Sequence, residues 1–276
     1  MNRLMFQTVV STALMEDVGA GDWTSEGIFS DEEKSKGVFV AKAEGVLAGM
    51  PVVKEVYRQM DSEVTVTSKV SEGQQVRNGT ILAEIHGSTR SVLMGERVAL
   101  NFLQRLSGIA SCTAKYAAIA SKYDCKIVDT RKTTPGLRLL EKYAVKTGGG
   151  YNHRLNLSDA VLIKDNHIHA AGSIVKAVEM LRETIPFTTA VEVEVESLKQ
   201  LEEALASGVE IVMLDNMPLS MMRQAVKIAG GRVTLEASGG ITLDNVEETA
   251  ACGVDLISVG ELTHSVKAMD ISLDLT

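Results

Sequence analysis

Hydrophobic and polar positions alternate along the first third of the chain. The segments GVFVAKAEGVLAGM (37–50) and EVTVTSKVSEGQQVRNGTILAEIHG (63–87) carry period-two apolar patterning broken by Gly and Asn turns, which predicts β-strands. Between them, PVVKEVYRQM predicts a short helix, because Pro51 suits a position in the first turn. The alternation therefore predicts a small α+β, sandwich-like domain at the N-terminal end.

From Ser91 the apolar spacing changes from two to between three and four. This spacing continues to Tyr123 and predicts helix, with a break near Gly108. Arg97 and Arg105 lie inside the stretch. A helix arginine is usually a surface residue or the partner of an acid, so the residues themselves indicate a structural role for both.

In the second half, apolar strand-like runs alternate with amphipathic helical segments. The six runs are KIVDT, AVLIKDN, AVEVEV, EIVMLDN, VTLEASGG and LISVGELTH. Strands separated by helices imply βα units and a parallel sheet. Each run ends in a polar or small residue, at the end of the strands where βα barrels carry their chemistry. Because only six strands are clear, we predict an open, incomplete α/β barrel.

Composition narrows the class of protein. The net charge of -8 argues against a nucleic-acid surface, which would need a basic stripe. No apolar run approaches the ~18 residues of a membrane span. The three cysteines are odd in number and widely spaced, which favours buried structural residues over a disulfide framework. With no targeting segment apparent, we expect a cytoplasmic protein that binds neither nucleic acid nor membrane.

Cations gather in one segment against this net charge. The segment Asp129–Asn166 brings together Arg131, Lys132, Arg138, His153, Arg154 and Lys164. Two strand-like runs end within it, so it reads as a site that grips a small, multiply anionic substrate. Lys164 could alternatively form a Schiff base, as lysines at strand ends do in barrel aldolases.

Carboxylates occupy the ends of neighbouring strands. Glu192 and Glu194 are two residues apart and point to one face of their strand, whereas the flanking valines point to the other. Asp215 and Glu236 follow on the next two strands. Oxygen-only ligands suit Mg²⁺ bound jointly with a substrate phosphate. Purely structural acids on a strand with one wet face are the alternative.

Glycine turns late in the chain predict a phosphate site. Ser238–Gly240 precede ITLDNVEETAACG, which we predict as a helix whose N-terminus would face an anion. Gly260 follows the next strand, and paired loops late in a barrel recurrently bind phosphate. The residues thus indicate a barrel enzyme for a phosphorylated sugar and an anionic second substrate.

Several motifs together resemble one known family. GERVALN, SGIAS, DTRKTTPGLR, KTGGGYNHRLNL, LIKDNH, VEVEV, LDN, EASGGI and SVGELTHS closely resemble the quinolinate phosphoribosyltransferase family, from Gly21 to the C-terminus. The resemblance implies transfer of phosphoribosyl from phosphoribosyl pyrophosphate (PRPP) to quinolinate with decarboxylation. The products would be nicotinate mononucleotide, pyrophosphate and CO₂, in NAD biosynthesis.

The resemblance also implies an architecture. An N-terminal α/β domain over residues 1–104 would carry the tail 266–276, and residues 105–265 would form an open α/β barrel of six or seven strands. A homodimer is implied, because the family takes an active-site arginine from the neighbouring subunit. That arginine matches Arg97, which would then be functional and not merely a surface residue.

Site residues follow from the matched motifs. Lys132, Lys164, Glu194 and Asp215 would be catalytic, and the following would bind quinolinate: Arg97, Arg131, Lys132, His153, Arg154 and Lys164. The residues that would bind PRPP are Glu194, Asp215, Ser238, Gly239, Gly260 and His264. Mg²⁺ would be held mainly through PRPP, with Glu194 and Asp215 nearby. Neither the motifs nor the resemblance assigns a role to Glu192 or Glu236.

Three alternatives stay open. A relative associated with molybdenum transport shares this fold and many of the motifs. Nicotinate phosphoribosyltransferase would leave the many cations unexplained, since its substrate has one carboxylate. A non-catalytic ligand-binding protein on the same scaffold would be expected to lose some of Arg131, Lys164, Glu194 and Asp215, and all four are present.

Overall fold

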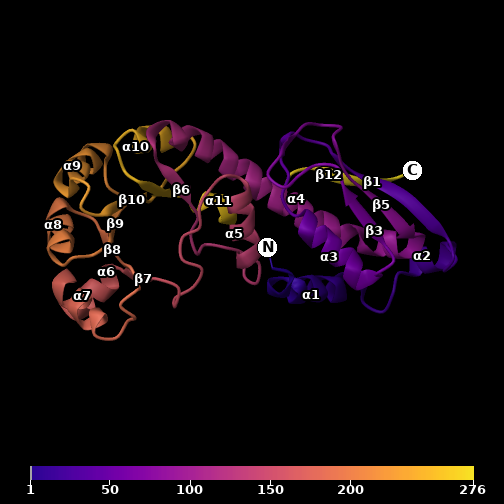
Figure 1. Ribbon diagram of the computed structural model, residues 1–276, viewed down its shortest axis with the longest axis horizontal. Helices are drawn as coiled ribbons and strands as arrows, with labels where there is room; N and C mark the ends of the chain where they lie inside the picture. Colours follow the sequence, from indigo (N-terminus) through magenta and orange to yellow (C-terminus); the bar gives the residue numbers. More distant parts are fainter. Residues whose placement is uncertain (1) are drawn as a thin grey trace. The chain divides into compact units, whose positions relative to one another are not determined.

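The structure, a computed structural model, describes residues 2–276, which form two compact units (Figure 1). The first unit comprises the residues up to Ala114 together with Thr133–Gly149 and Leu262–Thr276. The second comprises Lys115–Lys132 and Gly150–Glu261. Two segments of the chain therefore return to the first unit after it has been left.

An antiparallel sheet of order β12-β1-β5-β3 forms the centre of the first unit. Its strands are β1 (Lys34–Ala41), β3 (Thr65–Ser68), β5 (Ile81–Ser88) and β12 (Ile271–Leu275). A separate pair joins β2 (Gly45–Val46) to β4 (Gln75–Val76). Strand β12 comes from the C-terminal end and lies antiparallel to β1, with Leu273 opposite Phe39 (Figure 1). The C-terminal tail thus completes the sheet of the first unit.

The first unit also contains helices. They are η1 (Arg3–Met5), α1 (Gln7–Val18), α2 (Trp23–Ile28), α3 (Met50–Met60), α4 (Thr89–Ala120) and α5 (Arg138–Thr147). Helix α3 begins with proline in its first turn, as predicted. Its Val52, Val53 and Val56 are fully buried, and the Tyr57 ring packs edge-on against Phe39 of β1. Burial of this apolar face holds α3 on the sheet.

Helix α4 corrects one sequence-based expectation. It is continuous over 32 residues, so the predicted break near Gly108 is wrong. A Cβ atom at Gly108 would lie 2.3 Å from the carbonyl oxygen of Lys267, so this glycine allows the C-terminal tail to approach the helix. The helix also runs across the expected domain boundary between residues 104 and 105, and residues 133–149 belong to the first unit.

A parallel sheet of order β6-β11-β10-β9-β8-β7 organises the second unit. The strands are β6 (Lys126–Val128), β7 (Val161–Ile163), β8 (Val191–Val195), β9 (Ile211–Asp215), β10 (Thr234–Ser238) and β11 (Leu256–Ser258). Each of the six predicted runs contributes one of these strands. Tyr151 adds an isolated parallel bridge to Val128 at the β6 edge. The predicted α/β fold with an open, incomplete barrel is confirmed.

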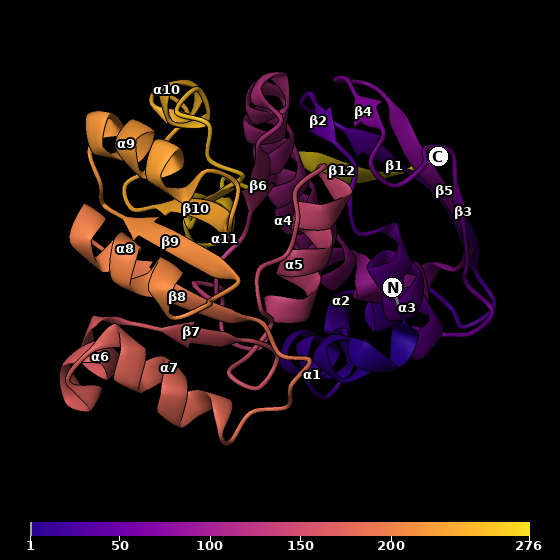
Figure 2. The same ribbon diagram turned by 60° about the vertical axis from the view of Figure 1, so that its left-hand side comes forward.

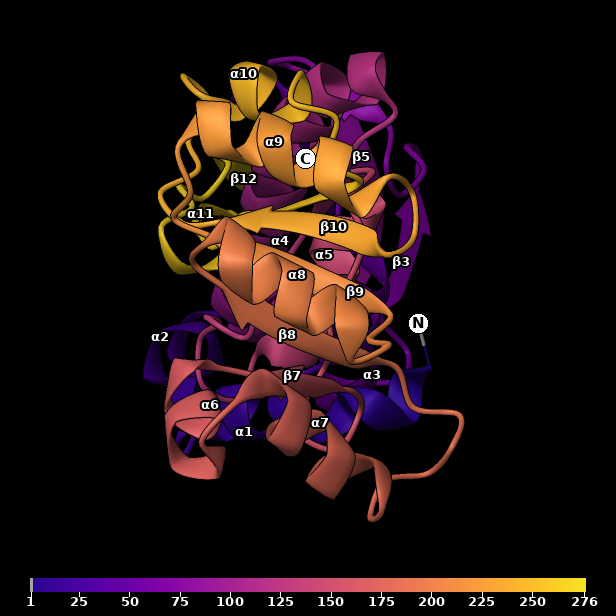
Figure 3. The same cartoon turned by 90° about the vertical axis from the view of Figure 1, so that its left-hand side faces the viewer.

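Helices cover one face of the parallel sheet, as Figures 2 and 3 show. The helical segments of the second unit are η2 (Ser121–Tyr123), α6 (Asp165–Ala171), α7 (Ile174–Arg182), α8 (Leu198–Ala206), α9 (Leu219–Ala229) and α10 (Val246–Ala250). The short α11 (Glu261–His264) lies mostly in the first unit. Buried apolar side chains such as Leu201 of α8 and Met222 of α9 lie between the layers. The opposite face of the strands is left for polar side chains.

Two further expectations concern the chain as a whole. Among residues 2–276, no helix combines the length and the apolar character that crossing a bilayer would require. Cys125 and Cys252 are buried and Cys112 is half-buried, and no disulfide joins them in this part of the chain. Their surroundings agree with the structural role expected from the sequence.

Candidate active site

Strand register places the predicted polar residues on one face of the parallel sheet. Leu162 pairs with Glu192, Met213 pairs with both Glu194 and Glu236, and Asp215 pairs with Ser238. Paired residues of parallel strands point to the same side, and alternate residues of one strand do so too. Six side chains therefore share this face: Lys164, Glu192, Glu194, Asp215, Glu236 and Ser238. The valines of β8 fill the other face, which α8 and α9 cover (Figure 3).

Lys164 and Glu194 form an ion pair at the end of β7 and β8. Lys164 Nζ lies 2.5 Å from Glu194 Oε2, and the two side chains are 44% and 13% exposed. The backbone N–H of Lys164 donates to His167 Nδ1 over 3.0 Å, which fixes the start of α6. Because the ammonium group remains open to solvent, it can reach a substrate anion.

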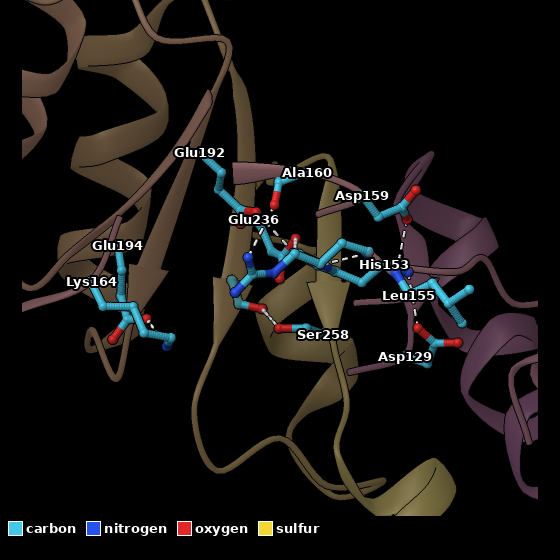
Figure 4. Close-up of polar contacts among 12 residues, drawn as sticks. Asp129, His153, Leu155, Asp159, Ala160, Lys164, Glu192, Glu194, Glu236 and Ser258 are labelled. Atoms are coloured by element: carbon cyan, nitrogen blue, oxygen red, sulfur yellow. Dashed lines mark hydrogen bonds and ion pairs between the residues drawn. The ribbon is translucent and has the colours of Figure 1, made fainter. Parts of the chain in front are cut away.

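A second group lies deeper on the same face. His153 Nε2 is 3.0 Å from Glu192 Oε2 and 3.6 Å from Glu236 Oε2, and both carboxylates are almost fully buried. Figure 4 shows these three side chains together, apart from the Lys164–Glu194 pair. Burial, and then the charge of Glu192, raises the pKa of Glu236 to about 7.

Asp129 holds the loop that carries His153 and Arg154. It is fully buried at the end of β6. Its Oδ1 accepts the backbone N–H of His153 over 2.9 Å (Figure 4). Its Oδ2 accepts the side-chain amide of Asn152 over 2.6 Å. Sequence reasoning noted Asp129 only as a strand end and overlooked Asn152. The signal available was an acid at a strand end together with an amide in the NHR motif.

Two of the predicted cations influence each other electrostatically. Burial, and next the positive charge of Arg131, lowers the pKa of Arg154, while Glu192 opposes this shift. The Arg154 guanidinium donates to the carbonyl oxygen of Ala160 over 3.0 Å. Arg131 and Lys132 are exposed just after β6. Two guanidinium groups that repel each other favour a bound anion, so the second unit brings most of the predicted cationic set together.

The loop after β10 requires glycine. Gly239 has φ +99, and a Cβ atom there would lie 2.2 Å from Asn216 Oδ1. The backbone N–H of Asn216 donates to the carbonyl oxygen of Ser238 over 2.9 Å. The loop after β9 therefore packs closely on the loop after β10, at the strand ends where Ser238 and Gly239 lie.

The helix predicted directly after this loop begins later than the sequence suggested. Helix α10 begins only at Val246 and has five residues, so Ser238–Gly240 do not stand at a helix N-terminus. A turn comes first, in which Asn245 Oδ1 accepts the N–H of Thr242 over 2.9 Å. Any anion here would meet turn backbone and not a helix dipole. Gly260 directly follows β11 and precedes α11.

Two predicted site residues belong to the first unit. Arg97 is exposed on α4, and His264 ends α11 with its Nδ1 2.5 Å from Ser265 Oγ. Their roles in substrate binding stay predictions from the resemblance. Gly260, in the second unit, likewise keeps a predicted phosphate role.

Comparison with known proteins decides the family. Residues 22–107 match the description "Quinolinate phosphoribosyl transferase, N-terminal domain", and residues 109–274 match the C-terminal domain of the same family. The chain belongs to the quinolinate phosphoribosyltransferase family. The predicted enzyme class, a phosphoribosyltransferase, is confirmed with it.

Individual relatives agree over the full length. A protein named probable nicotinate-nucleotide pyrophosphorylase (carboxylating), from Bacillus subtilis (strain 168), is 45% identical over 276 residues, which covers 100% of this chain and 95% of that protein. The crystal structure of NadC from Streptococcus pyogenes has a TM-score of 0.97 at 47% identity, covering 100% of this chain and 98% of that one. The nicotinate-nucleotide pyrophosphorylase structure from Francisella tularensis has a TM-score of 0.96 at 41% identity and the same coverage.

Proposed function

We propose that this chain transfers the phosphoribosyl group of PRPP to quinolinate and releases CO₂ and pyrophosphate, leaving nicotinate mononucleotide. The observation that carries the proposal is the shared face of the parallel sheet, where Lys164 pairs with Glu194 beside Asp215, in a chain that belongs to this family. The names of its relatives support the main reading and give no support to a molybdenum-associated or non-catalytic alternative.

The cations after β6 and β7 would bind the two carboxylates of quinolinate. Arg131 and Arg154 can each form paired hydrogen bonds to a carboxylate, and Lys132 and Lys164 add point charges. The half-open pair with Glu194 keeps Lys164 at the strand ends. This assignment gives Lys164 an anion-binding role in place of a Schiff base. His153 would hold its place in the same loop through Asp129 and Glu192.

The acids and the glycine turn would receive PRPP. Glu194 and Asp215 would contact the ribose, and the turn at Ser238 and Gly239, with Gly260 and His264, would hold the 5′-phosphate. As the C1–oxygen bond breaks, pyrophosphate takes the bonding electrons and the ring nitrogen of quinolinate supplies a new pair to C1. The carboxylates favour the positive charge that develops on the ribose. The 2-carboxylate then leaves as CO₂, and its electron pair stays on the ring carbon, which takes a proton.

We also propose Mg²⁺ as a cofactor, held mainly by PRPP. Glu194 and Asp215 are half-buried oxygen donors at the ends of neighbouring strands, which suits a hard cation. Two carboxylates are too few for an all-protein cage, and Mg²⁺ usually binds through one or two of them plus substrate phosphates. When bound, Mg²⁺ would neutralise the charge of the departing pyrophosphate.

A homodimer and a cytoplasmic location complete the proposal. Exposure of Arg97 on α4 is compatible with its donation to a neighbouring subunit's site. The three cysteines form no disulfide in residues 2–276, in keeping with a reducing compartment.

The test is a direct assay. The purified chain is incubated with PRPP and Mg²⁺, and either quinolinate or nicotinate is offered while CO₂ and nicotinate mononucleotide are followed. We expect both products from quinolinate, little turnover of nicotinate, and loss of activity when EDTA removes the metal. Absence of product with quinolinate would overturn the proposal.

A further inference from the structure

Two buried carboxylates, Glu192 and Glu236, lie next to His153 of the cationic loop. The proposed reaction assigns neither of them a role. Glu192 and Glu236 are 3% and 1% exposed. Both approach Nε2 of His153, at 3.0 and 3.6 Å (Figure 4). One oxygen of each carboxylate, Oε1, is buried without a hydrogen-bond partner in the part of the chain that the structure describes. Groups that are costly to bury in this way need a reason.

The hydrogen bond to the other ring nitrogen determines the tautomer of His153. The backbone N–H of Arg154 donates to His153 Nδ1 over 2.8 Å. An N–H can only donate, so Nδ1 must offer its lone pair and the ring proton must sit on Nε2. The Nε2–H bond then points at Glu192 and Glu236. His153 is therefore the neutral tautomer that links the acids below to the backbone of Arg154 above.

The same arrangement also limits the negative charge that lies next to the cationic side chains. Two full negative charges there would oppose a dianionic substrate. Burial, and next the charge of Glu192, raises the pKa of Glu236 to about 7, so Glu236 keeps part of its proton near neutral pH. Glu192 also acts on Arg154, whose pKa it raises against the effects of burial and Arg131. The two acids therefore stabilise the charged guanidinium of Arg154 without neutralising the cations that would bind the substrate.

A metal ion is the competing explanation for these three side chains. Their ligand atoms lie within 4.8 Å of one another, which a metal site could use. A metal bound through Nε2 would need the lone pair there and the proton on Nδ1. That proton would face the N–H of Arg154, which approaches Nδ1 to 2.8 Å as a donor. The hydrogen bond to Nδ1 therefore favours a proton between His153 and the acids.

We propose that Glu192 and Glu236 are positioning residues of the quinolinate site, which hold the Nε2–H edge of His153 and so fix the backbone and guanidinium of Arg154. The inference rests on the proposed function, because it assigns Arg154 to a substrate carboxylate. It goes beyond that function in giving the two acids a shared role that requires no contact with either substrate.

The first test needs no turnover. Nitrogen-15 NMR of imidazole-labelled wild-type protein should show His153 with a protonated Nε2 and an unprotonated Nδ1 at pH 7.5. Loss of one signal in His153→Asn assigns it among the five histidines. A protonated Nδ1, whether in the other tautomer or in an imidazolium, would overturn the inference whatever the activity assay shows. A change in the wild-type His153 signals on adding Zn²⁺ or Mn²⁺ alone would favour the metal reading instead.

The second test separates the substrates. Glu192→Ala should raise the KM for quinolinate about 10- to 100-fold and the KM for PRPP less than about 3-fold, because only the Arg154 side of the site loses its support. Glu192→Gln keeps an oxygen that can accept from Nε2–H, and should recover most of the loss. Glu236→Gln serves as the second variant if Glu192→Ala does not fold, with a smaller change in the same direction.

The matched control is Glu196→Ala, two residues beyond Glu194 and exposed, which should leave both KM values at the wild-type level. Equal increases for quinolinate and PRPP, or no recovery in Glu192→Gln, would contradict a positioning role. If wild-type protein does not turn over quinolinate, the proposed function fails, whereas the NMR result still decides the state of His153.

Discussion

Glu192 and Glu194 are the same residue type on the same face of β8, yet their surroundings differ. Glu192 is 3% exposed and meets a histidine and a second acid. Glu194 lies one pleat nearer the strand end, where its side chain is 13% exposed and pairs with a lysine that is 44% exposed. Figure 4 shows the two groups apart.

The difference shows that the position of a carboxylate along a strand decides which role it can have. A carboxylate beneath the site must be matched by a proton or a hydrogen bond, because water cannot reach it. A carboxylate at the strand end remains partly hydrated and can exchange its partner for a substrate. We therefore expect the deep pair to control stability and alignment, and the outer pair to act on the reacting groups.

The largest expected effect is on catalysis, from Glu194→Gln. Loss of this charge removes stabilisation of the developing positive charge on the ribose, and should lower kcat by about 10²- to 10³-fold. Unfolding in urea should change by no more than about 1 kcal/mol, since the pair is partly exposed. The control Glu202→Gln, on the exposed side of α8, should retain wild-type kcat. A wild-type kcat in Glu194→Gln would contradict the catalytic role proposed for this carboxylate.

A second effect concerns how stability depends on pH at Glu236. Its folded-state pKa of about 7 lies above the ordinary 4.5, so the unfolded chain loses this proton first as the pH rises. Its contribution to stability is fully present below pH 4.5 and is lost as the pH rises through 7, by about 3 kcal/mol at ~1.4 kcal/mol per pH unit. Glu236→Gln should remove this decline.

The measurement is urea unfolding of wild-type and Glu236→Gln proteins between pH 4.5 and 8. The difference in unfolding free energy should grow in favour of the variant as the pH rises. A difference that stays constant over this range would show that the buried acid does not hold a proton.

Substitution of Arg131 tests the proposed binding of quinolinate by the cationic side chains. Arg131→Ala should weaken quinolinate about 10- to 100-fold, as expected for loss of a charge-assisted hydrogen bond, with a much smaller effect on PRPP. Arg131→Lys should recover only part of this, because lysine lacks the planar fork. Equal losses for both substrates in steady-state kinetics would count against the assignment of the grip.

The smallest expected effect is the direct coupling between Lys164 and Glu194. A double-mutant cycle on Lys164→Ala and Glu194→Ala, read as unfolding free energy, should give a coupling below about 1 kcal/mol. A coupling well above that would mean that the outer pair is as closed as the inner one.

Much of the fold followed from periodicity. The six apolar runs became the strands of the parallel sheet, since a strand buried under helices needs consecutive apolar residues. Gly108 misled the same reasoning, because a glycine that breaks a helix and one that admits a neighbouring backbone look alike in sequence. The short α10 was also missed, because residues 241–245 form a turn held by Asn245.

The site was predictable where residues lie at strand ends. Lys164, Glu194, Asp215 and Ser238 share one face because alternation and register require it. The link from Asp129 to Asn152, and that from Glu192 and Glu236 to His153, joins segments far apart in the chain. No local pattern encodes which loop folds back over which strand, so these contacts needed the structure.

The most direct test of the account follows the carboxylate that should be lost. Quinolinate labelled with carbon-13 in either its 2- or its 3-carboxylate is incubated with the chain, PRPP and Mg²⁺. We predict that label from the 2-position appears as CO₂, one for each pyrophosphate formed, while label in the 3-position stays in nicotinate mononucleotide. Pyrophosphate without CO₂, or release of the 3-carboxylate, would contradict the proposed reaction.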